Sequence, residues 1–185
     1  MGEPNRCTWV GSSPLMMDYH DRRWCKPCHD DRELFAMLVL EGMQAGLSWS
    51  CIINKEAAIR RAFEGFDPAR VAEFDEIKVQ KMLEDPSIIR SRPKIESAIS
   101  NAQTFLKIQE EFGSFDAYIW KFTEGQTIDN QLANTADMPA QSPLSQKVSK
   151  DLKRRGFKFV GPVIVYSYLQ AIGVINDHEL SCSFR

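Results

Sequence analysis

The sequence predicts an all-α fold, and three observations support this prediction. Apolar residues recur at spacings of three and four along several segments, which is the period of an amphipathic helix. Asp, Ser or Pro precedes most of these segments and Gly or Pro follows them, as is typical of helix starts and stops. No segment has the alternating pattern of a strand between turn residues. We therefore expect a fold built from helices.

The predicted helices follow one another through short connections. We expect them at residues 15–23, 31–43, 49–63, 68–73, 76–84, 93–112, 115–120, 145–155 and 162–172. Ser48 and Asp75 have the chemistry of N-caps, and Gly46 can supply a positive φ in the turn after the second helix. Residues 123–143 are polar and contain two prolines, so we expect a surface connection without strands.

Length and composition indicate a single domain over residues 1–185. Of these residues 43% are hydrophobic, enough for one sizeable core. No apolar run reaches the length of a membrane span, and the first residues lack the apolar region of a signal peptide. We therefore expect a cytoplasmic monomer that does not associate with membranes. The formal net charge of −2 excludes no partner, because a nucleic-acid enzyme needs only a local basic face.

Glu41 occupies a position where the helical pattern predicts an apolar residue. It falls on the same face as Leu34 and Leu38, near the end of the second helix. A buried carboxylate is unfavourable without a partner, and the negative end of the helix dipole adds to that cost. Glu41 either lies at the edge of the apolar face and reaches water, or lines a pocket for a cationic or donor-rich ligand.

The cysteines favour metal binding or free thiols. Their number, five, is odd, and no secretory signal accompanies them, so a disulfide framework is not expected. Cys7 and His20 lie near the start of the chain, and His178 and Cys182 lie near its end with a spacing that suits one helical turn. A Cys₂His₂ set would be a structural site that joins the two ends of the chain.

A second group of metal-ligating residues competes with the first. Cys25, Cys28 and His29 have good local spacing for a metal ion. Buried Cys and His residues without any metal are a further alternative. The residues alone leave the choice of ligands open.

A basic segment precedes a turn that contains glycine. Its cations are Lys147, Lys150, Lys153, Arg154, Arg155 and Lys158. The turn runs from Gly156 to Gly161, and the last helix begins at Pro162. A helix, a hairpin and a helix suit a DNA phosphate, because backbone N–H groups and the positive end of the dipole face the anion. A solvated charged face that ends at a helix stop is the alternative.

Aromatic residues gather in the first fifty positions. Trp9, Tyr19, Trp24 and Trp49 accompany Glu41 and the first pair of metal candidates. Their ring faces can enclose a planar base, although aromatic residues in a chain of this size are also common in the core.

Several longer runs identify a family. They are R-C-x-W-V at 6–10, Y-H-D-x-x-W at 19–24, L-E-G-x-Q-A-G-L-S-W at 40–49, F-D-P at 66–68, I-I-R at 88–90, K-R-R-G-F-K-F-V-G at 153–161 and N-D-H at 176–178. In this combination the chain resembles the bacterial 3-methyladenine DNA glycosylase I family. The resemblance implies the helix-hairpin-helix glycosylase fold. It also implies one structural zinc ion on Cys7, His20, His178 and Cys182, which would tie segments 1–30 and 174–185 into a zinc-binding subdomain.

The resemblance further implies a DNA-repair glycosylase. Such an enzyme flips 3-methyladenine out of alkylated double-stranded DNA and hydrolyses its N-glycosidic bond. Glu41 would be the catalytic residue that recognises the cationic base, and the substrate-binding residues would be Trp49, Tyr19, Trp9, Trp24 and Met16. Met16 stands where some relatives carry an aromatic residue.

The same resemblance assigns residues to the DNA itself. Gln44, Ala45, Gly46 and Leu47 would fill the gap in the duplex, and Gly156, Lys158 and Gly161 would hold the phosphate backbone. We expect Lys158 to contact phosphate rather than act as an amine nucleophile, so the enzyme would lack lyase activity. Asp177 is expected to be a cap or a partner of His178. A zinc hydrolase and a non-enzymatic DNA-binding module are the alternative functions.

Overall fold

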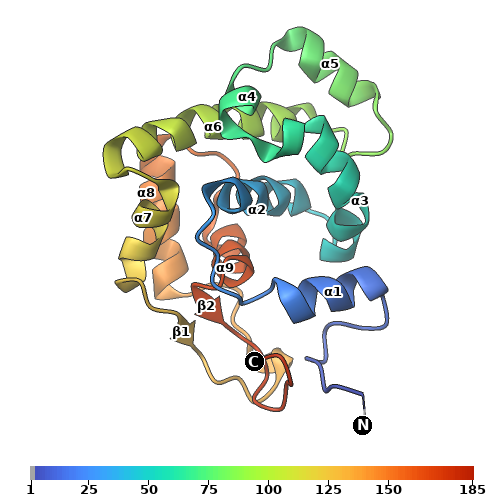
Figure 1. Cartoon of the computed structure of the whole chain (residues 1–185), viewed down its shortest axis with the longest axis vertical. Coiled ribbons are helices and arrows are strands. Elements are labelled where there is room, and N and C mark those ends of the chain that lie inside the picture. Colours follow the sequence, from blue (N-terminus) through green and yellow to red (C-terminus); the bar gives the residue numbers. More distant parts are fainter. Residues whose placement is uncertain (1–2) are drawn as a thin grey trace.

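The computed structural model describes residues 3–185, which form nine α-helices, three 3₁₀ turns and two short strands (Figure 1). The helices are α1 (Pro14–Arg22), α2 (Asp31–Gln44), α3 (Trp49–Ala62), α4 (Pro68–Ala72), α5 (Glu76–Glu84), α6 (Arg92–Phe112), α7 (Phe115–Trp120), α8 (Pro143–Arg155) and α9 (Pro162–Ala171). The 3₁₀ turns are η1 (Glu64–Phe66), η2 (Lys121–Thr123) and η3 (Thr135–Asp137). The predicted all-α class is therefore confirmed, with helix ends that differ from the predicted ones by a few residues. Residues 1 and 2 of the predicted domain lie outside the described range.

Helix α2 forms the centre of the core. Every side chain from Leu34 to Leu40 is buried, and α2 contacts α3, α6, α7 and α9. Figure 1 shows α2 and α9 in the middle of the molecule, with the other helices around them. A helix that is apolar on all sides is stable only when it is enclosed in this way. Its last turns, which include Glu41, therefore lie inside the protein.

Side-chain caps begin several helices at the predicted positions. The Ser48 hydroxyl accepts a hydrogen bond from the Cys51 N–H, and the Asp75 carboxylate accepts one from the Lys78 N–H. Gly46 has the predicted positive φ, +76°. These local interactions satisfy N–H groups that a helix leaves free at its start.

The prediction that residues 123–143 contain no strand is wrong. Ile128–Asp129 (β1) pairs in parallel with Ile175–Asn176 (β2), and η3 follows in the same segment. A strand of two residues is too short for periodicity to reveal it, and its partner lies far away in the sequence. The fold class does not change, because the sheet contains only these two residue pairs among the described residues.

The N-terminal segment docks on the end of α9. The Cys25 N–H donates to the Gln170 carbonyl (2.9 Å), and the Cys28 N–H donates to the Ile172 carbonyl (3.0 Å). A Cβ atom on Gly173 would lie 2.3 Å from the carbonyl carbon of Lys26, so this contact requires glycine. The docking brings the two ends of the chain together.

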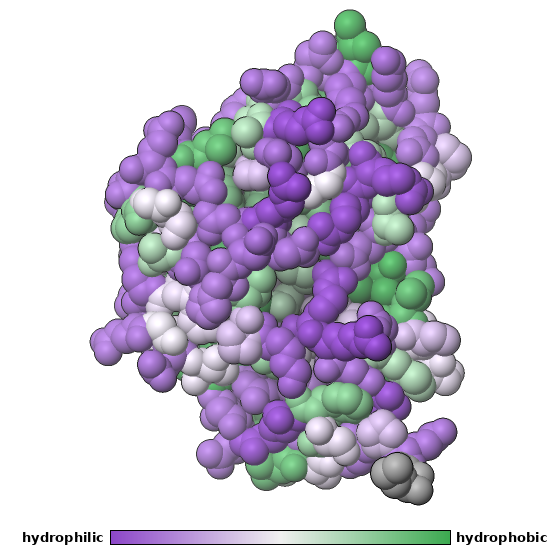
Figure 2. Space-filling view, in the orientation of Figure 1, coloured by the Kyte–Doolittle hydropathy of each residue, from purple (hydrophilic) through white to green (hydrophobic). Residues whose placement is uncertain are grey.

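The surface seen in Figure 2 is mostly hydrophilic, with apolar side chains in small separate patches. Leu47 is one of the exposed large apolar residues, with 40% of its surface accessible. No helix in the described range is long and apolar enough to cross a membrane.

Asp31 joins the start of α2 to the start of α7. Its carboxylate accepts hydrogen bonds from the backbone N–H groups of Phe115 and Asp116 (2.8 Å each) and from the Gln109 side chain (2.6 Å). Loss of the carboxylate leaves three partly buried donors without an acceptor. We therefore expect Asp31→Ala to lower the free energy of unfolding by about 2–3 kcal/mol, measured by urea denaturation.

Asp18→Ala is the matched control, because Asp18 lies in α1 with an exposed ion pair to Arg22. It is expected to change the free energy of unfolding by less than about 1 kcal/mol. Equal losses in the two variants would show that Asp31 does not hold α7 in place.

Candidate active site and metal centre

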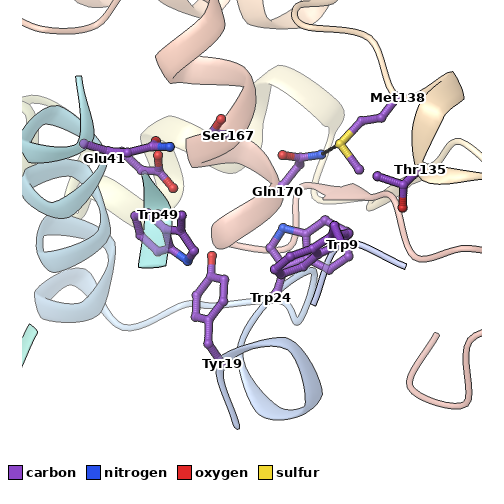
Figure 3. A pocket seen from close by; sticks show the side chains of 10 residues that line it. Trp9, Tyr19, Trp24, Glu41, Trp49, Thr135, Met138, Ser167 and Gln170 are labelled. Atoms are coloured by element: carbon purple, nitrogen blue, oxygen red, sulfur yellow. Dashed lines mark hydrogen bonds between the residues drawn. The ribbon is translucent and has the colours of Figure 1, made fainter. Parts of the chain in front are cut away.

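A pocket of about 210 Å³ lies between α1, the end of α2, the start of α3 and α9. Its lining residues are Trp9, Tyr19, Trp24, Glu41, Gln44, Trp49, Thr135, Met138, Ser167 and Gln170. Figure 3 shows Glu41 and Trp49 on one side, Trp9, Trp24 and Gln170 on the other, and Tyr19 between the two groups. The pocket therefore has polar groups on opposite sides and aromatic rings along its walls.

The Glu41 side chain is buried, with 2% of its surface accessible. This excludes the interpretation in which Glu41 reaches water at the edge of the helix. Its Oε2 atom has no hydrogen-bond partner among residues 3–185, and burial raises the pKa of the carboxyl group to about 8. Burial therefore favours the protonated form of Glu41 in the protein without ligand.

Two indole N–H groups in the same pocket also lack a partner in the described part of the chain. They are Trp9 Nε1 and Trp49 Nε1, and both atoms are buried. Buried polar atoms are nearly always hydrogen-bonded in a folded protein. Two donors and one acceptor without partners around one cavity indicate a ligand with polar atoms on its edges.

Aromatic rings form the walls of the pocket. Trp9 and Trp24 meet edge to face, with ring centroids 4.9 Å apart, and Tyr19 and Trp49 are tilted against each other at 5.1 Å. Burial and the nearby Glu41 raise the pKa of Tyr19 well above its usual value, so its hydroxyl stays protonated. The pocket suits a flat aromatic ligand.

The structure brings together five of the six residues predicted to form the base pocket. Met16 is the exception: it packs into the core from α1, and the described lining of the pocket does not include it. Its side chain is directed to the interior because α1 buries the face that carries it. Gln44, which the sequence assigned to the duplex, also lines the pocket.

Four lining residues were missed by the sequence reasoning. Thr135 and Met138 belong to the segment predicted as a plain surface connection, and no pattern there indicates a site. Ser167 and Gln170 belong to α9. Gln170 is buried on an apolar helix, which is the same anomaly that marked Glu41 and would have identified it.

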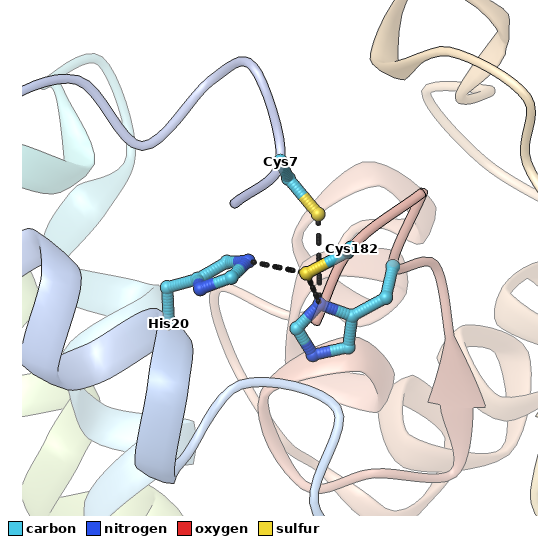
Figure 4. Close-up of side chains that lie close together, drawn as sticks. Cys7, His20 and Cys182 are labelled. Carbon is cyan, nitrogen blue, oxygen red and sulfur yellow. Dashed lines mark hydrogen bonds between the residues drawn. The ribbon is translucent and has the colours of Figure 1, made fainter. Parts of the chain in front are cut away.

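Cys7, His20, His178 and Cys182 converge at one buried place (Figure 4), and their candidate ligand atoms all lie within 4.8 Å of one another. The Nδ1 atom of His178 lies 3.5 Å from the Cys7 sulfur and 3.4 Å from the Cys182 sulfur. The Nε2 atom of His20 lies 3.6 Å from the Cys182 sulfur. Tetrahedral zinc with usual bond lengths would place such atoms about 3.5 Å apart, so the four residues fit this ion.

The other ring nitrogens of both histidines have partners. Nδ1 of His20 lies 2.7 Å from Asp21 Oδ1, and Nε2 of His178 lies 3.2 Å from the Trp24 carbonyl. These contacts leave Nε2 of His20 and Nδ1 of His178 facing the sulfur atoms, as is common for metal-bound histidines. Burial raises the pKa of the Cys7 thiol to about 12, so a thiolate at this place needs a cation.

The rival ligands Cys25, Cys28 and His29 do not form a comparable group. The Cys25 sulfur accepts a hydrogen bond from the Asp177 N–H at 3.3 Å, and the Cys28 thiol faces the Asp30 carbonyl. His29 lies 2.7 Å from Asp116 on the surface. The three side chains therefore point to different partners.

Asp177 does not contact His178 in the predicted way. Its carboxylate accepts hydrogen bonds from Tyr166, Gln170 and Asn130, at 2.6, 2.6 and 2.7 Å. The prediction was wrong because adjacent side chains in this extended segment, which includes β2, point in different directions.

The hairpin between α8 and α9 is fixed by α6. The Asn101 side chain accepts a hydrogen bond from the Lys158 N–H (2.8 Å) and donates one to the Lys158 carbonyl (3.0 Å). The Lys158 side chain itself is exposed. A shallow groove beside the hairpin is lined by Gln146, Ser149, Lys150, Lys153 and Pro162.

Lys94, also in α6, fixes the turn after α2. Its ammonium group donates to the carbonyls of Met43 (2.9 Å) and Ala45 (2.6 Å). No sequence pattern indicates either Lys94 or Asn101, because both contacts join distant segments. Together they hold the two loops that were predicted to contact DNA.

Comparison with known proteins shows which family the chain resembles. Residues 9–185 match the family model described as methyladenine glycosylase. DNA-3-methyladenine glycosylase 1 of Escherichia coli (strain K12) is 41% identical over 177 residues, which are 96% of this chain and 95% of that protein. DNA-3-methyladenine glycosylase of Haemophilus influenzae is 36% identical, with 96% of each chain covered.

Solved structures show the same relationship. The 3-methyladenine DNA glycosylase I of Staphylococcus aureus has a TM-score of 0.93 at 36% identity, with 98% of this chain and 97% of that chain covered. A variant of 3-methyladenine DNA glycosylase I in complex with 3-methyladenine has a TM-score of 0.94 at 36% identity, with 97% of this chain and 96% of that chain covered. The chain therefore belongs to the methyladenine glycosylase family.

Proposed function

We propose that the protein is a monofunctional DNA-3-methyladenine glycosylase that acts in base-excision repair of alkylated duplex DNA. The observation that carries this proposal is the set of three buried polar atoms without partners, on Trp9, Glu41 and Trp49, around one aromatic pocket. The names of the relatives, and the bound 3-methyladenine in one of them, support the choice of ligand.

The methylated base supplies much of the chemical driving force. Methylation at N3 gives adenine a positive charge and weakens its N-glycosidic bond, so the leaving group needs no added proton. The C1′–N9 bond breaks with its electron pair going to the base, and water adds to C1′ with loss of a proton. The pocket therefore has to bind and orient the cationic base more than it has to supply an acid.

Glu41 distinguishes the cationic base from normal bases. Ionised Glu41 attracts the positive ring and accepts a hydrogen bond from one N–H of its amine, while Trp49 stacks on the ring. A neutral base lacks this attraction and leaves the carboxylate buried without a counter-charge. Selectivity for the damaged base follows from this electrostatic match.

Two loops would hold the DNA while the base is flipped. Residues 44–47, with the exposed Leu47, would fill the space that the flipped base leaves. Gly156, Lys158 and Gly161 of the hairpin would bind the phosphate backbone. The contacts of α6 with both loops set their relative position.

One zinc ion on Cys7, His20, His178 and Cys182 would be structural. When bound, it cross-links the two ends of the chain and supplies no reaction chemistry. Four protein ligands leave no open position of the kind that a zinc hydrolase needs. Among the alternatives, a non-enzymatic DNA-binding module would not need the unpartnered Glu41.

The direct test is incubation of the protein with methylated duplex DNA, followed by chromatography of the released bases. We expect free 3-methyladenine without strand scission. No released base would contradict the proposed function, and scission would contradict its monofunctional form.

Glu41→Gln should lower kcat/KM on the order of 100-fold, because the neutral amide cannot balance the charge of the base.

The pH dependence of excision tests the role of Glu41 further. The ionised form attracts the substrate and burial favours the protonated form, so wild-type kcat/KM should rise with pH until about 8 and then level off. The Glu41→Gln profile should lack this rise.

The same pKa shift makes the stability of the protein depend on pH. Between pH 4.5 and 8 the folded wild-type protein binds the Glu41 proton more tightly than the unfolded chain does. Its free energy of unfolding should therefore fall with rising pH relative to Glu41→Gln. Unfolding of the variant at all pH values would instead mean a structural carboxylate.

Cys182→Ser tests the metal centre. We expect zinc affinity to fall at least tenfold and the melting temperature to fall with it, because the cross-link is lost. Zinc content measured by mass spectrometry and thermal unfolding check this. Cys28→Ser is the control and should retain full zinc content. Loss of zinc from Cys28→Ser together with full zinc content in Cys182→Ser would instead assign the metal to Cys25 and Cys28.

Asn101→Ala tests the fixation of the hairpin. Without the two hydrogen bonds to Lys158, the phosphate-binding loop loses its fixed position, and affinity for duplex DNA should fall about tenfold. Binding of free 3-methyladenine, followed by tryptophan fluorescence, should stay unchanged. Ser100→Ala, which removes a hydroxyl that bonds only within α6, should affect neither. Equal losses of DNA and base affinity would show general damage instead.

A further inference from the structure

Gln170 is a buried polar side chain of the base pocket, as Glu41 is. It belongs to α9, only 5% of its surface is accessible, and it lines the pocket on the side of Trp9 and Trp24 (Figure 3). A buried amide on an apolar helix is unfavourable unless its polar atoms are used. The function proposed above does not employ it.

The Asp177 carboxylate determines how the Gln170 amide is turned. Gln170 Nε2 donates to Asp177 Oδ2 at 2.6 Å and also faces the Met138 sulfur at 3.1 Å. The same carboxylate receives the Tyr166 hydroxyl at 2.6 Å and the Asn130 amide at 2.7 Å. With three donors directed at it, the carboxylate acts as an acceptor, so Gln170 must present its NH₂ group there.

The carbonyl oxygen of Gln170 therefore points in the opposite direction. Figure 3 shows this oxygen on the side away from Met138, facing the pocket. No donor among the described residues binds it, whereas the NH₂ group has two contacts. The amide cannot turn over without placing its oxygen against the Asp177 carboxylate.

We propose that the Gln170 carbonyl, held in place by Asp177, is a hydrogen-bond acceptor for an N–H group of the bound base and makes the pocket prefer adenine over guanine. This inference rests on the proposed function, because it assumes that a methylated purine occupies the pocket. Gln170 is then a specificity-determining residue, and Asp177 is its positioning residue.

The two purines differ in the chemistry that this acceptor meets. Adenine carries an amine at position 6, which donates hydrogen bonds, and guanine carries an oxygen there, which accepts them. The Gln170 oxygen attracts the amine and repels the oxygen. Because Asp177 prevents the amide from turning over, the pocket cannot adapt to guanine by offering the NH₂ group. Rejection by a fixed polar group of this kind is stronger than rejection by shape alone.

The test compares 3-methyladenine with 3-methylguanine, both as free bases binding to the zinc-loaded protein and as products released from methylated duplex DNA. Gln170→Met keeps the size of the side chain but removes the acceptor. We expect the preference for 3-methyladenine to fall at least tenfold in both measurements. Asp177→Asn allows the amide to turn over and should lower the preference in the same direction, by a smaller factor.

Tyr166→Phe is the matched control. It removes one donor to Asp177 but leaves the contact between Asp177 and Gln170, so the preference should stay as in the wild type. Thermal unfolding and zinc content identify any variant that is simply damaged, which matters because Asp177 adjoins His178.

The outcomes separate this inference from the proposed function. If the wild-type protein binds 3-methyladenine but releases none from DNA, the proposed function fails, and the binding preference still tests Gln170. If folded Gln170→Met and Asp177→Asn keep the wild-type preference in base binding, the inference is wrong. It is also wrong if the wild-type protein does not prefer 3-methyladenine.

Discussion

The docking of the N-terminal segment on the end of α9 is the interaction on which the site depends. Trp9, Tyr19 and Trp24 come from the first part of the chain, and Ser167 and Gln170 come from α9. The pocket exists only because backbone hydrogen bonds and the close approach of Lys26 to Gly173 hold these parts together. The Cys₂His₂ cluster joins the first part of the chain to the segment after α9, so a metal ion there would stabilise the site without entering it.

The pocket keeps unfavourable electrostatics that a ligand can relieve. Glu41 lies buried in the last turns of the central helix, and burial raises its pKa because the charged form loses its water. The unpartnered indole N–H groups of Trp9 and Trp49 add to the cost. A planar cation with polar edges compensates the buried Glu41 carboxylate. This explains why the central helix retains a carboxylate that costs stability in the free protein.

Helix α6 connects the base pocket with the surface that would face DNA. Lys94 binds the carbonyls at the end of α2, and Asn101 binds the hairpin, about two helical turns further along the same helix. One rigid element therefore fixes both loops relative to each other and to Glu41. Excision of a flipped base needs such fixed geometry, because small displacements of the reacting groups cost much of the rate.

The sequence alone determined the helical class, most helix starts and the anomaly at Glu41. These features follow from local rules: the 3.6-residue period, capping side chains and the cost of a carboxylate on an apolar face. The resemblance to a known family then supplied the ligand set and most pocket residues. Periodicity by itself left Cys25, Cys28 and His29 as equal candidates for the metal.

Only the tertiary structure decided which distant residues meet. It separated the two groups of candidate metal ligands, buried Met16 in the core, and placed Thr135 and Met138 of the predicted surface connection in the pocket. It also turned Asp177 towards Gln170 instead of His178. The physical reason is the same in each case. A local pattern determines which face of an element is apolar, whereas the residues that a side chain contacts on another element depend on how the elements pack.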